Sequence, residues 1–267
     1  MWYIIRMSKK QPILFSIFQD AFYFFDKHWI VIVAGACLSV GLADIVSYLL
    51  SVFVPMGAVD LRAATGGDIK IENYILVEAG AVFLAGVWFR GYIAVLVGGD
   101  AGATTPSLSN AFKAAAKLYP RLLSVNLVAI IITYSTAAIG LLIMSANALG
   151  AIFLVPAILF SVWFSLITPV AVFDSAKGIL PRLKRSRALV SGHFIQLLFL
   201  MFVVVTPTFA MAGIGEETSL FWPVLTFVNV STAIIDGLFV TFAYHRLRAA
   251  HAAELLAKRD AAQPSND

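Results

Sequence analysis

The sequence predicts an all-α integral membrane protein of six transmembrane helices, paired as three hairpins with a cytoplasmic interfacial amphipathic helix before each. Hydrophobic residues make up 60% of the 267 positions and charged residues only 13%, against roughly 25% in an ordinary soluble domain. Six apolar stretches are long enough to cross a hydrocarbon core, which takes about 20 helical residues. Lys and Arg residues gather on one side of these stretches. We expect one polytopic membrane domain, residues 1–267.

The six predicted spans follow one another along the chain. They cover residues 29–54, 74–98, 122–146, 151–173, 194–212 and 221–244. Only residues 147–150 separate the third span from the fourth, which indicates a tight hairpin. The first span is too long for the core of a cleavable signal peptide and has no small-residue cleavage site after it. Either Met1 or Met7 is a possible start of translation, and Met7 has the more ordinary context.

Lys and Arg are distributed asymmetrically about the spans. The N-terminal segment, the 99–121 and 174–193 connections and the C-terminal tail carry four, three, five and four of them, 16 of the 19. The opposite connections carry only Arg62 and Lys70, and Arg90 lies within a span. Because basic segments stay on the cytoplasmic side, both termini are predicted to be cytoplasmic. The net charge of +4 belongs to this asymmetry and requires no nucleic-acid partner.

A similar segment precedes each pair of predicted spans, at residues 12–28, 106–121 and 178–193. Each has apolar residues at three- and four-residue intervals on one side and polar or cationic residues on the other. This pattern is typical of helices that lie in the membrane interface. The segments therefore predict three interfacial helices on the cytoplasmic side.

Each segment with its hairpin forms one unit of a predicted threefold repeat. The units cover residues 11–98, 106–173 and 178–247, and a cytoplasmic tail with a disordered end follows at 248–267. Val87-Trp88-Phe89 of the first unit returns as Val162-Trp163-Phe164 in the second. Two spans per unit give all units the same orientation. The alternative is that apolar sequences resemble one another by composition.

A short motif follows the fourth span. It comprises Pro169, Val172-Phe173-Asp174, Gly178, Leu183, Arg185-Ser186, Leu189 and Gly192-His193. With it the chain resembles the glycerophosphoryl diester phosphodiesterase membrane-domain superfamily, which includes the YciC-like bacterial inner-membrane proteins. Asp174 stands where that pattern usually has Glu, and Arg187 where it often has an aromatic residue. The resemblance implies the fold and the inner (cytoplasmic) membrane. It does not imply phosphodiesterase activity, because the catalytic domain of that family is a separate soluble module.

Four charged residues lie within predicted spans: Arg90, Asp236, Asp44 and Glu78. An unpaired charge there costs at least a few kcal/mol. Arg90 and Asp236 both lie roughly 15 residues from the outer ends of their spans, so at about 1.5 Å per residue their depths match. They form either a structural ion pair or a polar site in a cavity. Asp44 is expected to face a polar cavity or to be protonated, and Glu78 to lie near the head groups.

The connection before the fifth span carries a basic run. Its residues are Lys177, Arg182, Lys184, Arg185 and Arg187. Anionic lipid head groups attract such residues by about 1 kcal/mol per charge near the surface. The run is therefore a candidate for anionic-lipid contact, and the alternative is that it only fixes the topology.

Catalytic and metal-binding patterns are missing from the sequence. Cys37 is the one cysteine, the four histidines are spread over three segments, and no zinc, nucleophile-elbow or phosphate-loop motif occurs. No cofactor and no catalysis are expected. The leading hypothesis is a non-enzymatic inner-membrane protein in membrane or lipid and envelope organisation. The alternative is a small-solute or lipid transporter that uses Arg90, Asp236 and Asp44. A membrane enzyme is the weakest hypothesis, since it would need His193 and Asp174 to meet at a polar cavity.

Overall fold

The computed structural model describes residues 12–53, 58–60, 70–101, 107–146, 151–152, 154–211 and 221–262. These parts of the chain are helical apart from one small ribbon. The helices are α1 (Ile13–Phe53), α3 (Asn73–Ala101), α4 (Leu108–Ala146), α5 (Leu154–Phe164), α6 (Ile167–Phe173), α7 (Ile179–Val190), α8 (Phe194–Met211) and α9 (Phe221–Ala262). Strands β1 (Ala58–Asp60) and β2 (Lys70–Glu72) pair antiparallel. The sequence did not predict this ribbon. Met1, Met7, the 147–150 link and the end of the tail lie outside the described residues.

Five helical segments of the described chain are long and apolar enough to cross a membrane. They lie in α1, α3, α4, the α5–α6 pair and α9. A sixth is added if α7 and α8, which are bent by 99° at their junction, count as one span. The prediction of an all-helical chain with several helices long and apolar enough to span a membrane is confirmed, and their number of five to six is compatible with a multi-pass membrane protein.

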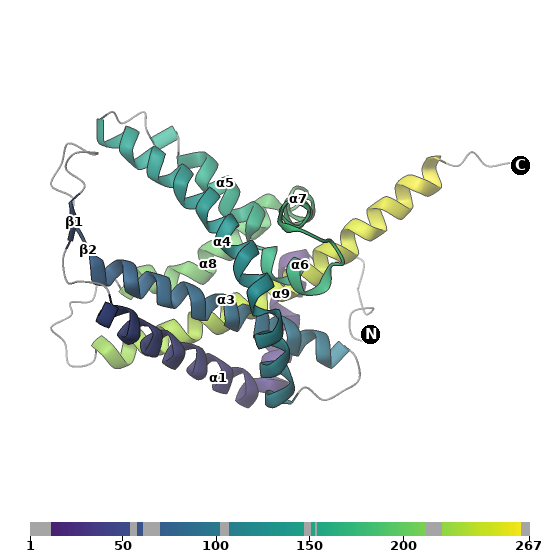
Figure 1. Cartoon of the computed structure of the whole chain (residues 1–267). Helices are drawn as coiled ribbons and strands as arrows, with labels where there is room; N and C mark the ends of the chain where they lie inside the picture. Colours follow the sequence, from purple (N-terminus) through teal and green to yellow (C-terminus); the bar gives the residue numbers. More distant parts are fainter. Residues whose placement is uncertain are drawn as a thin grey trace, which may run out of the picture.

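The helices form two groups that diverge (Figure 1). In one group, α1, α3 and the first part of α9 lie side by side, with α8 against α9. In the other, α4 and α5 lie side by side and lean away from the first group. The second part of α9 extends beyond the other helices. In Figure 1, helix α7 lies between α5 and the second part of α9, and it is bent by 99° from α8.

The main apolar core joins α1, α3, α8 and α9 with parts of α4, α5, α6 and α7. The Tyr92 ring lies at its centre and is fully buried, and the Tyr92 hydroxyl donates to the Val31 carbonyl at 2.8 Å. Helix α1 approaches so closely here that a Cβ on Gly35 would lie 2.3 Å from the Tyr92 ring. A small residue therefore sets the distance between α1 and α3, as is common in membrane helix packing.

The structure differs from the predicted pattern of separate interfacial helices. Helix α1 runs through the 12–28 segment into the first span and is kinked at His28, whose φ and ψ are −126° and 17°. Helix α4 likewise runs on through Pro120. Only the third segment is a helix of its own, α7, which a turn at residues 191–193 separates from α8. The kink at His28, Pro120 and the turn at 191–193 nevertheless lie next to the predicted starts of the first, third and fifth spans.

The predicted span at 151–173 is broken into α5 and α6 at Ser165 and Leu166. Pro169 explains the break, because proline has no N–H to donate to the carbonyl four residues earlier, that of Ser165, and its ring clashes there. The break also leaves the Trp163 carbonyl free for a side chain of α7, and the Ser186 hydroxyl donates to it at 2.6 Å. The broken span thus becomes an attachment point for α7.

Candidate functional site

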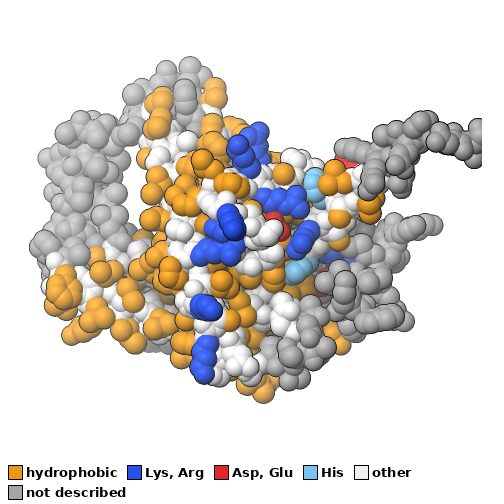
Figure 2. Space-filling model, turned by 45° about the vertical axis from the view of Figure 1, so that its right-hand side comes forward, with side chains coloured by type: hydrophobic (Ala, Val, Ile, Leu, Met, Phe, Trp, Pro, Cys, Tyr) orange, Lys and Arg blue, Asp and Glu red, His pale blue; other side chains and the backbone are white. Residues whose placement is uncertain are grey.

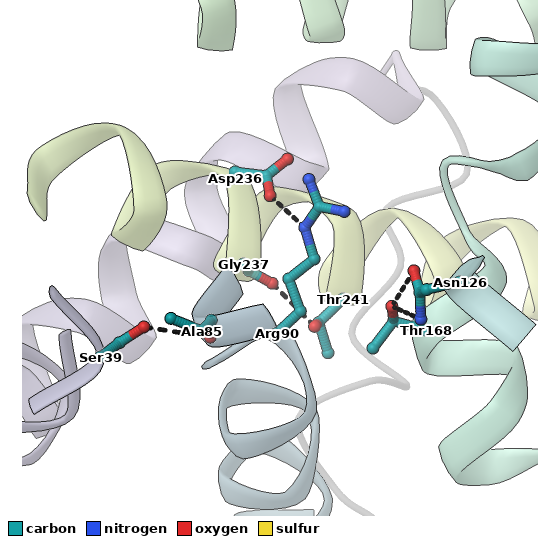
Figure 3. Close-up of polar contacts among 8 residues, drawn as sticks. All are labelled: Ser39, Ala85, Arg90, Asn126, Thr168, Asp236, Gly237 and Thr241. Carbon is teal, nitrogen blue, oxygen red and sulfur yellow. Dashed lines mark hydrogen bonds and ion pairs between the residues drawn. The ribbon is translucent and has the colours of Figure 1, made fainter. Parts of the chain in front are cut away.

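Arg90 of α3 and Asp236 of α9 form a direct ion pair (Figure 3). Arg90 Nε donates to Asp236 Oδ2 at 2.5 Å. The structure therefore brings together the two charges that the sequence predicts to lie at the same depth. The Asp236 side chain is 20% exposed and that of Arg90 42%. The Asp236 side chain is thus largely enclosed, whereas the Arg90 side chain is partly exposed.

Close packing of α3 against α9 brings the pair within reach. Gly237 follows Asp236, and a Cβ on it would lie 3.1 Å from Ile93 Cγ1, so only a small residue suits this contact. The Thr241 hydroxyl donates to the Gly237 carbonyl at 2.8 Å, within α9 (Figure 3). On the other side of α3, the Ser39 hydroxyl of α1 donates to the Ala85 carbonyl at 3.1 Å. Bonds and close contacts on both sides hold α3 in register.

Asp44 and Glu78 are not part of this ion pair. Both side chains are exposed, on α1 and α3 respectively. Neither makes an ion pair with another residue that the structure describes. The four intramembrane charges thus separate into one pair and two single carboxyl groups.

A second polar centre surrounds Asp174, directly after α6. Its Oδ1 accepts from the Tyr244 hydroxyl of α9 at 2.9 Å, and its Oδ2 accepts from Arg185 Nε of α7 at 3.3 Å. Its backbone carbonyl accepts from an Arg121 Nη of α4 at 3.1 Å. Asp174 therefore joins α4, α7 and α9 at the end of α6. The sequence drew attention to Asp174 as a motif residue and, with His193, as a residue that an enzyme would need, but not as a contact between helices. An acidic residue between a span and a basic helix was the available signal.

Tyr244 and its neighbours extend this centre along α9. The Tyr244 hydroxyl also accepts from Arg248 Nη1 at 3.1 Å, and the Phe173 ring stacks on the Tyr244 ring at 5.5 Å between centroids. Two residues further, Arg246 binds both carboxylate oxygens of Asp20 on α1, at 2.6 and 2.7 Å. Sequence reasoning missed this ion pair, because its members are 226 residues apart and each resembles an ordinary interfacial charge.

The five residues of the basic run have different surroundings. Lys177 and Lys184 are exposed. Arg187 is exposed too, with its guanidinium over the Trp163 ring at 4.3 Å from the centroid. Arg185 is bound to Asp174, and Arg182 is buried. Only three of the five, Lys177, Lys184 and Arg187, therefore stand free of the protein interior.

Arg182 lies on the buried face of α7, and the residue as a whole is only 8% exposed. The next residue, Leu183, packs with Val125 of α4 and Ile167 of α6. Burial desolvates the Arg182 guanidinium, and the nearby charge of Arg121 repels it. The Nε atoms of both arginines are buried and have no hydrogen-bond partner in the part of the chain that the structure describes. Two like charges thus meet where α4 contacts α7.

Lys and Arg side chains form a band across this side of the molecule, bordered by hydrophobic side chains (Figure 2). Within the described ranges, no group of three or more His, Cys, Asp and Glu residues could hold a metal ion. His193 Nδ1 lies 3.0 Å from Gln196 Oε1, and Asp174 is bound to Tyr244 and Arg185. The contacts of these two side chains are therefore with other residues and not with each other.

The chain matches no protein-family model, no curated protein and no solved structure. The chemistry of the two polar centres is therefore what indicates a function.

Proposed function

We propose that this chain is a non-enzymatic protein of the bacterial inner membrane whose basic side binds anionic lipid head groups, and that it serves membrane, lipid or envelope organisation. One observation carries the proposal: four arginines gather where α4, α6, α7 and α9 meet. Arg185 binds the Asp174 carboxylate, Arg121 binds the Asp174 carbonyl, Arg248 binds its partner Tyr244, and Arg182 lies close to Arg121. Such a surplus of positive charge needs anions, and the surface of a membrane supplies them as lipid phosphates.

The proposal includes an orientation with both termini and the basic band in the cytoplasm. The asymmetry of Lys and Arg supports it. The resemblance to the glycerophosphoryl diester phosphodiesterase membrane-domain superfamily stays a prediction and agrees with it. The kink at His28, the Pro120 position and the turn at 191–193 agree with three interfacial segments and a threefold repeat. Lys177, Lys184 and Arg187 are the residues exposed for lipid contact.

Lipid retention tests this function. The purified full chain is incubated with equal amounts of phosphatidylglycerol and phosphatidylcholine, and native mass spectrometry counts the lipids that stay bound. We expect the wild-type chain to retain phosphatidylglycerol preferentially. Substituting Gln for Lys177, Lys184 and Arg187 together should reduce that preference, since each charge near the surface contributes about 1 kcal/mol.

A matched control removes charge from the opposite connections. The Arg62→Gln, Lys70→Gln variant loses two cations that the sequence assigns to the other side of the membrane. This variant should keep the wild-type preference for phosphatidylglycerol. If the wild-type chain retains both lipids equally, the proposed function is wrong.

The exposure of Arg90 supports a second candidate, transport of a small anionic solute or lipid. Although bound to Asp236, the Arg90 side chain is still 42% exposed and so can be reached from outside the pair. If the chain is a transporter, the variant that exchanges the two charges, Arg90→Asp with Asp236→Arg, should fold but no longer take up the anionic solute into reconstituted vesicles. A purely structural pair predicts no uptake by the wild-type chain either.

A further inference from the structure

Among the arginines whose side chains the structure describes, six bind a protein group. Arg90, Arg185 and Arg246 bind carboxylates, Arg121 a carbonyl, Arg248 a hydroxyl and Arg187 an aromatic ring. Arg182 makes no such contact with any described residue, although it is more than nine-tenths buried. A guanidinium carries five N–H donors, and leaving buried donors unpaired is costly.

The fold places this side chain inward. The buried residues of α7 are Arg182, Leu183, Ser186, Leu189 and Val190. Arg182 thus lies one turn before Ser186 and next to Leu183. Ser186 is bound to the Trp163 carbonyl, and Leu183 packs on α4 and α6. Because both neighbours are held, α7 cannot turn Arg182 outward without losing a hydrogen bond and an apolar contact.

Among the described residues, no carboxylate forms an ion pair with Arg182. Asp174 Oδ1 and Oδ2 are taken by Tyr244 and Arg185. The neighbouring charged group is Arg121, which repels it. Arg121 also has an unpaired buried Nε. Two positive groups with open donors therefore converge from α4 and α7.

We propose that Arg182 and Arg121 form a discrete site for a phosphate group at the contact between α4 and α7. A phosphate offers several acceptor oxygens and negative charge to two guanidinium groups, whose planar donor sets bind such oxyanions in a bidentate manner. It would satisfy the open donors and remove the repulsion between the two arginines. The phosphate is that of a lipid head group or a free phosphate ion. In the lipid case the site rests on the proposed function and makes it specific.

Thermal unfolding of the full chain in a phosphate-free maltoside detergent tests this site. The additions are inorganic phosphate, phosphatidylglycerol and, at equal ionic strength, sodium chloride. We expect phosphate or phosphatidylglycerol to raise the unfolding midpoint of the wild-type chain and chloride to leave it unchanged. A response to phosphatidylglycerol alone identifies the lipid, and a response to inorganic phosphate identifies the free ion as sufficient.

The variant Arg182→Gln should bind the active additive about tenfold more weakly or worse, because it loses charged hydrogen bonds. The matched control is Lys117→Gln, which removes the same charge from an exposed position one turn before Arg121 on α4 and should keep the wild-type response. Arg182→Lys serves if the Gln variant does not fold, and it should bind more weakly than wild type since it lacks the planar donor set.

Two results would overturn the site: no response of the wild-type chain to either additive, or an equal response in wild type and the Arg182 variants. These results are distinct from failure of the proposed function. If the Lys177, Lys184 and Arg187 variant keeps its lipid preference while Arg182→Gln loses the phosphate response, surface lipid binding is wrong and the phosphate site stands. If instead the triple variant loses its lipid preference and Arg182→Gln keeps the phosphate response, surface lipid binding stands and the phosphate site is wrong.

Discussion

The two polar centres of this protein balance charge in opposite ways. In the first, Arg90 meets Asp236 one to one, on two helices deep within predicted spans. In the second, Asp174 binds Arg185 through its carboxylate and Arg121 through its backbone carbonyl. Arg248 and Arg182 lie one contact further away, so four arginines share one acidic group. Apolar surroundings provide nothing but protein to neutralise a charge, so a single pair is the stable solution there. Where head groups and ions can reach, surplus charge is tolerated and becomes a means of binding.

The largest effect is expected from breaking the one-to-one pair. Asp236→Ala leaves Arg90 without its carboxylate and should lower the free energy of unfolding by about 2 kcal/mol, less than the loss for a fully buried pair because Arg90 is partly exposed. Adding Arg90→Ala should restore part of that loss. Unfolding in detergent mixtures measures both, with Glu78→Ala as an exposed control. A double variant less stable than Asp236→Ala would contradict the structural pair.

The second centre should respond to loss of its carboxylate and to salt. Asp174→Asn weakens the bonds from Arg185 and Tyr244 and leaves the arginines without a counter-charge. We expect a loss of about 1.5 kcal/mol at low ionic strength. The loss should shrink as sodium chloride is added, because salt screens accessible charges. The loss of unfolding free energy in Asp236→Ala serves as the reference and should change less with salt. If the losses in both variants depend equally on salt, the two centres do not differ in their access to ions.

Removing a charge from the arginine-rich centre should have the opposite sign. Arg182→Met replaces a buried, unpaired guanidinium by an apolar side chain of similar length and relieves its repulsion by Arg121. In phosphate-free detergent the free energy of unfolding should rise by about 1 kcal/mol. The exposed Lys184→Met provides the comparison and should be near neutral. A loss of stability in Arg182→Met would mean that Arg182 has a protein partner.

The smallest effect concerns single hydroxyl groups. Tyr244→Phe removes the bonds to Asp174 and Arg248, whereas Tyr92→Phe removes one bond to the Val31 carbonyl. We expect a loss of about 0.6 kcal/mol for Tyr92→Phe, typical of a hydrogen bond in a membrane protein, and a larger one for Tyr244→Phe. Thermal unfolding of both variants under the same conditions measures the difference. Equal losses would mean that Asp174 gains little from Tyr244.

Much of the architecture follows from the local pattern of residues. Apolar runs of sufficient length require helices, because a bilayer leaves backbone groups no other partner. The charge distribution about those runs predicts the basic side, and the constant rise of a helix matches the depths of Arg90 and Asp236. The starts of the predicted spans, near His28, Arg121 and His193, coincide with a kink, a proline and a turn.

Apart from the Arg90–Asp236 pair, which the matched depths predicted as one alternative, only the tertiary structure decided which charges meet. The sequence pattern of α7 did not identify Arg182 as buried, because a cationic residue in an amphipathic helix is expected on the polar face. Its burial depends on how α7 is rotated against α4 and α6 and on the 99° bend before α8. The Asp20–Arg246 pair and the contacts of Asp174 likewise join distant helices. The sequence by itself determined the helices and the distribution of charge along the chain, since these depend on neighbouring residues. Rotation and packing between helices determined the binding partners, since these depend on the whole chain.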